Sequence, residues 1–301
     1  MSTTIIGAGL AGLMAGSIFQ RAQIFEAGPE DQANHKAVLR FRGSAVGDTL
    51  GIDFRKVTVH KGIYHDNRFV QPTVQLANYY SKKVIGRLYD RSIWKTEPVE
   101  RFIAPEDLIA QLVERCNERI KWSHPIHCIN KEEINISTAP LPVMAKMLGV
   151  DTKDHEFKAA PVEVRRWRVP DCDVFQTIYF PSPEINLYRA SITGNLLIAE
   201  YVDKGGKIEG SSDLFEAFGF YEDECELLDA TRQSYGKIAP INDAWRRDFI
   251  LQASSRHNVY SLGRYATWRP SVLLDDVLKD IYVIKKLIGG DGYARSMHAA
   301  A

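Results

Sequence analysis

The sequence lacks the features that mark several classes of protein. Its four cysteines, Cys116, Cys128, Cys172 and Cys225, form no C-x-x-C pair, which argues against a zinc cluster or a dithiol redox motif. No run approaches the roughly 20 apolar residues that cross a bilayer. Lys plus Arg equals Asp plus Glu, at 38 each, so no overall charge draws the chain to nucleic acid or to an acidic membrane.

The N-terminus also lacks the basic segment and long apolar run of a secretory signal, which favours a cytoplasmic protein. No pattern of metal ligands is present, and we expect no metal site and no membrane partner. The chain of 301 residues is 45% hydrophobic, enough for a sizeable core and for two domains. Nothing in the sequence indicates an oligomeric state.

The first motif is a dinucleotide-binding fingerprint near the N-terminus. Residues 7–12 read GAGLAG, directly after the apolar residues 4–6 and before an apolar stretch over 10–20. This G-x-G-x-x-G spacing at a strand-to-helix junction predicts a turn at Gly7, a close approach of phosphate to Gly9 and tight helix packing at Gly12. The helix that follows directs its N-terminal amides at the phosphates.

A second apolar strand over residues 22–25 ends at Glu26, 19 positions beyond Gly7. An acid at this spacing typically accepts hydrogen bonds from the adenosine ribose hydroxyls. The strand, the three glycines, the apolar helix and the terminal acid together predict a nucleotide cofactor.

The opening IGAGLAGL followed by FEAG resembles the start of the glutathione-reductase-type flavoproteins, which hold FAD. The resemblance implies that a last strand and helix also reach the cofactor. Here residues 258–268 read NVYSLGRYATW, and an apolar helix is expected over 273–288. Gly263, Arg264 and Asp276 are thereby implied as contacts to the pyrophosphate or the flavin.

Residues 29–45 are polar and basic and predict a loop that enters a short strand. Arg40 and Arg42 alternate in it, so in a strand they share one face. One of them is expected to reach the pyrophosphate or the N1–O2 edge of the flavin. The alternative is that they form a solvated basic strand face.

The expected fold class is α/β, with a Rossmann-like FAD-binding domain of the glutathione-reductase type and an interleaved antiparallel-sheet substrate domain. We assign residues 1–45, 100–150 and 245–290 to the first domain, and 46–99 and 151–244 to the second. Period-two alternation over 162–167, 176–180 and 187–192 predicts antiparallel strands. Short helices are expected at 213–218 and 225–234.

Three further segments suggest a narrower family. The GRYATW turn at 263–268, YRAS at 188–191 and STAP at 137–140 together resemble UDP-galactopyranose mutase and the amine oxidases. The chain is also similar to small bacteriophage-encoded flavoproteins of the amine-oxidase type, some of which act in hypermodification of thymidine in phage DNA. The resemblance implies an oxidoreductase or lyase that acts at an amine-bearing carbon, with a small molecule or a modified nucleobase as substrate.

Two alternatives stay open: a non-redox mutase that uses reduced flavin on a nucleotide sugar, and a non-catalytic FAD-binding protein. The chain has no second G-x-G-x-x-G unit for a nicotinamide cofactor, so we expect the substrate to reduce the flavin.

The catalytic candidates are Lys237, Tyr188 and Arg189. Arg189 suits a bidentate clamp on a substrate carboxylate, and Tyr188 a pocket wall, with Tyr179 beside it. Lys237 is expected before the final strand, near the flavin N5 through a water, as in amine oxidases. Trp268 suits either stacking on a base or the flavin, or ordinary packing.

Residues 165–168, RRWR, are basic and aromatic. Such a run suits a nucleic-acid backbone beside a stacked base, or else a solvated strand face.

Overall fold

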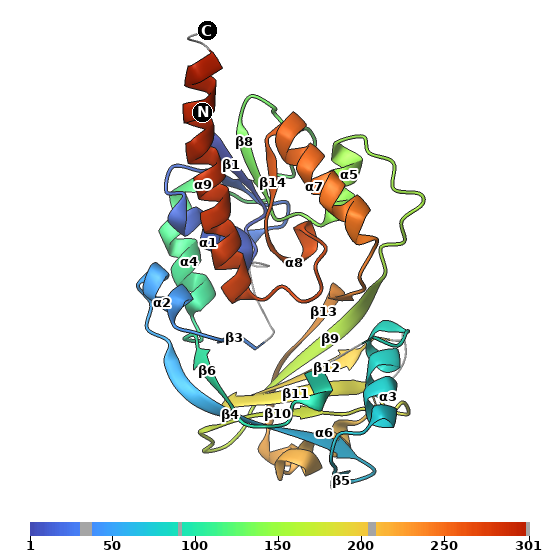
Figure 1. Cartoon of the computed structure of the whole chain (residues 1–301). Helices are drawn as coiled ribbons and strands as arrows, with labels where there is room; N and C mark the ends of the chain where they lie inside the picture. The colour runs from blue at the N-terminus through green and yellow to red at the C-terminus, as the bar shows by residue number, and fades with distance from the viewer. Residues whose placement is uncertain (31–37, 90–91, 204–208, 299–301) are drawn as a thin grey trace.

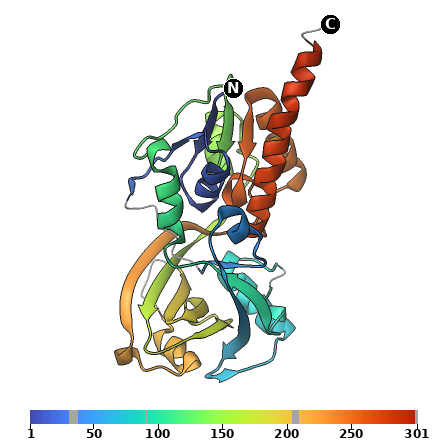
Figure 2. The same ribbon diagram turned by 90° about the vertical axis from the view of Figure 1, so that its left-hand side faces the viewer.

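A computed structural model describes residues 1–30, 38–89, 92–203 and 209–298 of the protein. Within these ranges the chain forms two sheets, each in its own lobe, with the lobes stacked one above the other (Figures 1 and 2). Both ends of the chain lie at the upper lobe, where α9 projects beyond the body (Figure 1).

The upper lobe is built on a five-stranded sheet of order β14-β8-β1-β2-β7, in which every pairing is parallel. Its strands are β1 (Thr3–Ile6), β2 (Gln23–Phe25), β7 (Ile120–Lys121), β8 (Ile134–Ser137) and β14 (Val259–Ser261). The central strands β1 and β8 are buried on both faces because helices cover both. This is the open, doubly covered sheet that the N-terminal motif predicts.

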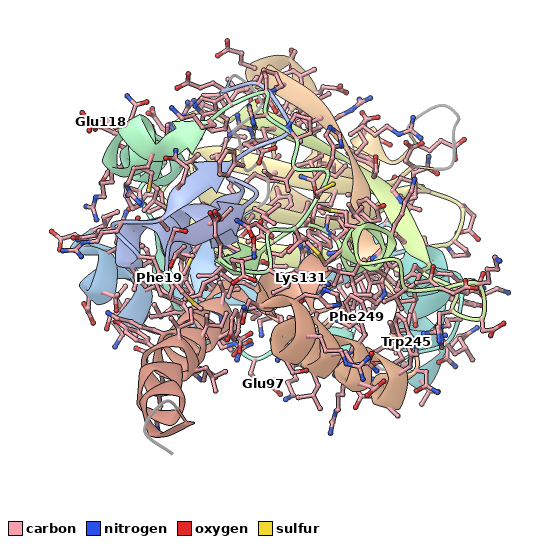
Figure 3. The ribbon with its side chains drawn as sticks, turned by 90° about the horizontal axis from the view of Figure 1, so that it is seen from above. Phe19, Glu97, Glu118, Lys131, Trp245 and Phe249 are labelled. Atoms are coloured by element: carbon pink, nitrogen blue, oxygen red, sulfur yellow. The ribbon has the colours of Figure 1, made fainter. Side chains whose placement is uncertain are left out.

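Seven helices belong to this lobe among the described residues. They are α1 (Leu10–Ile18), α2 (Ala45–Leu50), α4 (Leu108–Cys116), α5 (Leu141–Met147), α7 (Asp243–His257), α8 (Gly263–Ala266) and α9 (Leu274–His298). Two apolar clusters hold them to the sheet, one beneath α1, α4 and α9 and one beneath α5 and α7. On α7, the rings of Trp245 and Phe249 stack with centroids 5.7 Å apart, and both side chains are marked in Figure 3.

The lower lobe is built on a sheet of order β13-β9-β12-β11-β10-β4-β6-β3, with β5 paired to β4. Its strands are β3 (Arg40–Phe41), β4 (Arg55–His65), β5 (Arg68–Phe69), β6 (Val99–Ile103), β9 (Ala159–Arg168), β10 (Val174–Tyr179), β11 (Leu187–Gly194), β12 (Leu196–Val202) and β13 (Glu226–Ile238). All pairings are antiparallel except that of β10 with β4.

The two faces of this sheet have different covers. The helix α6 (Ser211–Phe218) packs on the face that points away from the upper lobe. The other face, here called the inner face, is covered at one end by α3 (Val74–Ile85). Three 3-10 turns complete the described elements: η2 (Ser92–Trp94), η3 (Asn117–Arg119) and η4 (Glu222–Glu224).

The expected fold class is confirmed: a Rossmann-like α/β lobe is joined to a largely antiparallel sheet. The chain crosses between the two lobes more than once. β3 and most of β6 come from ranges that the sequence assigned to the first domain, yet both strands pair in the lower sheet.

Two local expectations need revision. The helix expected at 225–234 is wrong, because all of this segment after Cys225 lies in β13, which pairs along β9. Its Glu, Leu, Ala and Gln residues have helical propensity, but pairing with a neighbouring strand overrides it. The sequence interpretation also missed α7, whose N-cap Asn242 accepts a hydrogen bond from the backbone N–H of Trp245 at 3.0 Å.

Across the described residues, no helix combines the length and the apolar character that crossing a membrane requires.

Candidate functional site

Two of the three glycines in the N-terminal turn, Gly7 and Gly12, have no room for a side chain. Gly7 has φ +100°, and a Cβ on it would lie 2.2 Å from Oγ1 of Thr138. A Cβ on Gly12 would lie 1.9 Å from the carbonyl oxygen of Gly7, because α1 crosses directly over the turn. A Cβ on Gly9 would meet nothing within 4 Å. The turn therefore packs tightly on its protein side and leaves open space at Gly9.

Glu26 closes this turn at the end of β2. Its carboxylate accepts hydrogen bonds from the backbone N–H groups of Ala8 at 2.6 Å and Gly28 at 2.9 Å. The acid thus lies beside the glycine turn, as the spacing predicts. Its contact with a ribose stays a prediction.

A second glycine turn, from the other end of the chain, meets the first. Gly263 begins α8 with φ +89°, and a Cβ on it would lie 3.2 Å from the Cβ of Ala11 on α1. The strands β1 and β14 flank β8 and run parallel to it, so both strands end at the same edge of the sheet. Two glycine turns about 250 residues apart in sequence therefore form one surface at the carboxyl edge of the sheet.

The start of α9 is tied to the segment after β3. Asp275 accepts from the backbone N–H groups of Arg42 and Gly43 at 2.9 and 3.3 Å. Asp276 accepts from the N–H of Leu273 and from the Arg42 guanidinium at 3.0 and 3.2 Å. These contacts fix the N-terminus of α9 beside the second glycine turn.

Arg264 directs its guanidinium at the carbonyl oxygen of Val272, with Nε at 3.1 Å and Nη2 at 3.0 Å. It braces the connection between α8 and α9 in this way.

Arg40 and Arg42 do not act as neighbours on one face, contrary to the sequence expectation. Arg42 contacts the start of α9, whereas the Arg40 side chain lies on the lower sheet. Its Nη1 donates to Oγ1 of Thr177 at 2.7 Å, and its Nη2 to Oγ1 of Thr193 at 2.7 Å. Nη2 also contacts the carbonyl oxygens of Gln176 and Ile192. The two arginines separate because the chain crosses from one lobe to the other here.

The catalytic candidates Tyr188 and Arg189 are adjacent in β11, yet both serve the inner face. The register with β12 shifts between Leu187 and Arg189, a bulge that leaves Tyr188 as the extra residue. Arg189 then stands opposite Glu200 of β12 and forms a two-point ion pair with it, through Nε to Oε2 and Nη2 to Oε1 at 2.7 Å.

This ion pair governs the charges of the inner face. The Glu200 side chain is 8% exposed and that of Arg189 is 30% exposed. Burial opposes ionisation of Glu200, but the charges of Arg189 and then Lys237 lower the pKa of Glu200 to about 2. Burial works against the charge of Arg189 as well, yet Glu200 raises the pKa of Arg189 well above its ordinary value. Two nitrogens of the Arg189 guanidinium therefore already bind Glu200, and fewer of its N–H groups remain for the expected clamp on a substrate carboxylate.

Lys237 lies near the end of β13, the strand that precedes the last strand, β14. Its Nζ stands 5.3 Å from the ring centroid of Tyr188, a cation–π contact. Tyr80 of α3 contacts the rings of both Tyr179 and Tyr188, with centroids 5.5 and 6.3 Å away. The structure thus brings Lys237, Tyr188 and Arg189 together around Glu200, beside an aromatic wall.

The second glycine turn borders this group. Tyr265 of α8 contacts the ring of Tyr235 of β13, with centroids 6.2 Å apart. Burial raises the pKa of Tyr265, and the charge of Glu200 adds to that effect. Tyr265 therefore links the second glycine turn to β13, the strand that also carries Lys237.

Two other candidates have structural roles. Trp268 is buried, donates from Nε1 to the carbonyl oxygen of Ala239 at 3.0 Å and packs edge-on to Phe157, which favours packing over stacking on a ligand. In the RRWR run, Trp167 is buried against Phe215, and Arg166 pairs with Asp229 at 2.5 Å. This run lacks a ring that could stack on a base.

Sequence reasoning missed Glu200, Arg40's sheet contacts and Tyr265. Glu200 had a readable signal, since it is the one acid in the apolar strand sequence LLIAEYV of β12, and a charge inside such a strand requires a partner. The sequence did not identify Arg189 as this partner, because the bulge in β11 determines which residue stands opposite Glu200.

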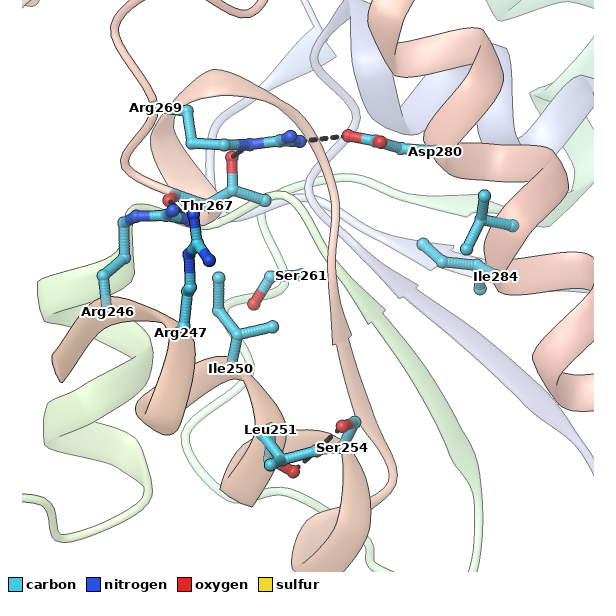
Figure 4. Close-up of a pocket in the computed structure, with 11 residues that line it drawn as sticks. Arg246, Arg247, Ile250, Leu251, Ser254, Ser261, Thr267, Arg269, Asp280 and Ile284 are labelled. Carbon is cyan, nitrogen blue, oxygen red and sulfur yellow. Dashed lines mark hydrogen bonds and ion pairs between the residues drawn. The ribbon is translucent and has the colours of Figure 1, made fainter. Parts of the chain in front are cut away.

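A separate cavity of about 550 Å³ lies between α7 and α9 (Figure 4). Three arginines line it, and acids hold all three: Arg246 and Arg247 pair with Asp243, and Arg269 pairs with Asp280. Its remaining walls include Ile250 and Ile284 (Figure 4). Each of its arginines forms an ion pair, but Asp243 serves two of them, so these five residues carry one formal positive charge.

Comparison with known proteins gives a fold but no close relative. No protein-family model matches the chain, and no curated protein sequence matches it. Among solved structures, a Pyrococcus furiosus protein is 14% identical with a TM-score of 0.57, covering 94% of this chain and 96% of its own. An oxidoreductase from Methanosarcina mazei is 9% identical with a TM-score of 0.55, over 95% and 100% of the two chains.

The p-nitrophenol 4-monooxygenase of Pseudomonas putida DLL-E4 is 12% identical with a TM-score of 0.52, over 87% of this chain and 73% of its own. The fold is Rossmann-like and of the FAD-binding type. At these identities the likeness concerns the fold, and function has to be argued from the site.

Proposed function

We propose that the protein is an FAD-dependent oxidoreductase that oxidises or cleaves its substrate at an amine-bearing carbon. The observation that carries the proposal is the meeting of the two glycine turns at Ala11 and Gly263, with the Glu200 group of the lower sheet next to them. A dinucleotide fingerprint on one lobe and a buried polar group on the facing sheet suit a cofactor held between the lobes.

The residues present fit FAD. The open space at Gly9 and the N-terminus of α1 suit a pyrophosphate, and Glu26 at the end of β2 suits the ribose hydroxyls. Gly263 and the start of α9 suit the other end of the cofactor. FAD, when bound, would accept two electrons from the substrate, and the protein would orient the reacting bond and exclude water.

The amine-type reaction is supported by the charges of the inner face. An amine gives up electrons only in its neutral form, and cations near it lower its pKa. Lys237, Arg40 and the partly neutralised Arg189 supply such cations, while Tyr179 and Tyr188 supply apolar walls. A free amine and an amino-acid-modified thymidine in DNA are both substrates of this kind.

A non-redox rearrangement of a nucleotide sugar is the second candidate. One observation favours it: the cations of the inner face also suit a diphosphate. The two candidates differ in whether substrate alone reduces the flavin.

The purified protein is expected to be yellow, with flavin absorbance between about 350 and 500 nm. Anaerobic addition of amino acids or of glycine-bearing nucleosides should bleach it, because a substrate amine reduces the flavin. An unchanged spectrum until dithionite and a nucleotide sugar are added would favour the second candidate. A protein that is colourless and takes up no FAD would contradict the proposal as a whole.

Replacing Glu26 with alanine is expected to weaken FAD binding by about 10- to 100-fold, since a charged acceptor contributes roughly 1.5–3 kcal/mol. The measurement is the quenching of FAD fluorescence on titration of FAD-free protein. Glu118→Ala, at an exposed acid of the same lobe (Figure 3), serves as the control and should bind FAD as the unchanged protein does. Equal affinities for both variants would remove Glu26 from the site.

A further inference from the structure

Three basic side chains stand together on the inner face of the lower sheet: Arg40, Lys61 and Arg101, called the β3–β6 cation cluster below. The strand registers place them there. Arg40 pairs with Ile103 of β6, two residues from Arg101, and Lys61 of β4 pairs with Thr177, whose hydroxyl accepts from Arg40. Residues two apart in a strand share a face, so all three cations point to the same side.

The hydrogen bonds of this cluster go to neutral oxygens. Arg40 donates to hydroxyls and carbonyls of β10 and β11. Lys61 donates to the carbonyl oxygen of Lys95 at 3.2 Å, and Arg101 to that of Glu100 at 2.6 Å. Within the ranges that the structure describes, none of the three forms an ion pair, and the buried Nε of Arg40 has no acceptor.

The cluster is electrostatically strained as a consequence. Burial, followed by the charges of Arg189 and Arg101, lowers the pKa of Arg40 to about 9, so Arg40 still carries its charge at neutral pH. Burial and the charge of Arg101 also lower the pKa of Lys61, and the acid Glu97 offsets this only in part. Buried like charges of this kind call for a counter-ion.

Other arginines of the protein differ in this respect. Arg189 on the same face pairs with Glu200, and each of the three arginines between α7 and α9 forms an ion pair with Asp243 or Asp280. The β3–β6 cation cluster departs from that pattern at the border of the Glu200 group, since the charge of Arg189 acts on Arg40.

We propose that the β3–β6 cation cluster binds an anionic group of the substrate, a carboxylate or a phosphate. The inference rests on the proposed function, because it takes the inner face as the substrate site. Lys61 and Arg101 are half-buried and supply donors to the anion, while the charge of Arg40 adds to the attraction. The substrate is then an amine that also carries an acid, such as an amino acid or a nucleotide bearing an amine.

The test is calorimetric titration of the FAD-loaded protein with three probes in turn: succinate, inorganic phosphate and pyrophosphate. Saturable binding is expected in the millimolar range or tighter. Lys61→Gln and Arg101→Gln should each weaken the binding at least about tenfold, the equivalent of one charged hydrogen bond. Arg40 is not replaced, because its loss would leave hydroxyl and carbonyl oxygens of β10 and β11 without a hydrogen-bond donor.

Lys56→Gln is the matched control. Lys56 lies on the same strand as Lys61 but points to the opposite face of the sheet, and it pairs with Glu100 at the surface. Its removal should leave anion binding unchanged. Tighter binding of succinate identifies a carboxylate site, and tighter binding of phosphate or pyrophosphate identifies a phosphate site.

Either preference supports the inference if Lys61→Gln and Arg101→Gln bind the preferred anion more weakly than the unchanged protein does. No saturable binding of any probe, or equal losses in Lys56→Gln and Lys61→Gln, would overturn it. The flavin absorbance of the same samples tests the proposed function separately: a yellow protein without anion binding contradicts the cation site alone, and a colourless protein contradicts the function.

Discussion

Replacing Gly12 with alanine is expected to abolish FAD retention and to destabilise the fold. The added Cβ would lie 1.9 Å from the carbonyl oxygen of Gly7, a backbone atom that cannot rotate away. Either α1 or the turn must shift, at a cost of about 3 kcal/mol in the free energy of unfolding. Urea unfolding of the FAD-free protein measures that cost, and the absorbance of the purified variant measures the retained FAD.

Gly9→Ala separates cofactor binding from folding. A Cβ on Gly9 meets no atom within 4 Å and the residue has an ordinary φ of −65°, so the FAD-free variant should unfold as the unchanged protein does. We nevertheless expect it to lose FAD, because the methyl group would occupy the space proposed for the pyrophosphate. If Gly9→Ala bound FAD with full affinity, this turn would not be the pyrophosphate site.

Gly289→Ala provides the control for both glycine variants. This glycine lies in α9, where a Cβ meets nothing within 4 Å, and alanine there should stabilise the helix by roughly 0.5–1 kcal/mol. FAD binding should not change.

Replacing Glu200 with alanine is expected to lower the free energy of unfolding by about 3–5 kcal/mol, because it leaves the guanidinium of Arg189 without its partner on a buried sheet face. Arg189→Met in the same chain should recover part of the loss, since the buried charge is then removed as well. Additive losses in the double variant would show that the two residues act independently.

The same pair predicts a pH dependence. The pKa of Glu200 is lowered to about 2 in the folded protein, so its stabilisation is complete above the ordinary glutamate pKa and is lost as the pH falls from about 4.3 towards 2. A shift of this size corresponds to about 3 kcal/mol. The difference in unfolding free energy between the unchanged protein and Glu200→Gln should therefore shrink between pH 5 and about pH 2.

Asp173→Asn is the control for this experiment. Asp173 pairs with Arg55 at 2.8 Å, but both side chains are more than half exposed. Solvent screens such a pair, and its loss should leave unfolding nearly unchanged. A Glu200 variant that behaved like Asp173→Asn at every pH would contradict a buried, mutually dependent pair.

The amino-acid sequence by itself determined the strand–turn–helix unit at the N-terminal end of this protein. The turn depends on the positive φ of Gly7 and on the close approach of Gly12 to the Gly7 carbonyl five residues away, so the spacing of three glycines is sufficient to predict it. Glu26 follows from the length of one helix and two strands. The last strand and helix were also readable, because β14 is a short apolar run and α9 is a long segment with repeated apolar residues.

Only the tertiary structure decided the inner face of the lower sheet. The bulge in β11 sets which residue faces Glu200, and a shift of one residue would turn Arg189 to the other side. Segment 226–238 became a strand by pairing with β9, some 65 residues away, against its own helical propensity. Arg40 meets Thr177 across 137 positions of sequence. Such contacts depend on long-range register, which local patterns do not encode.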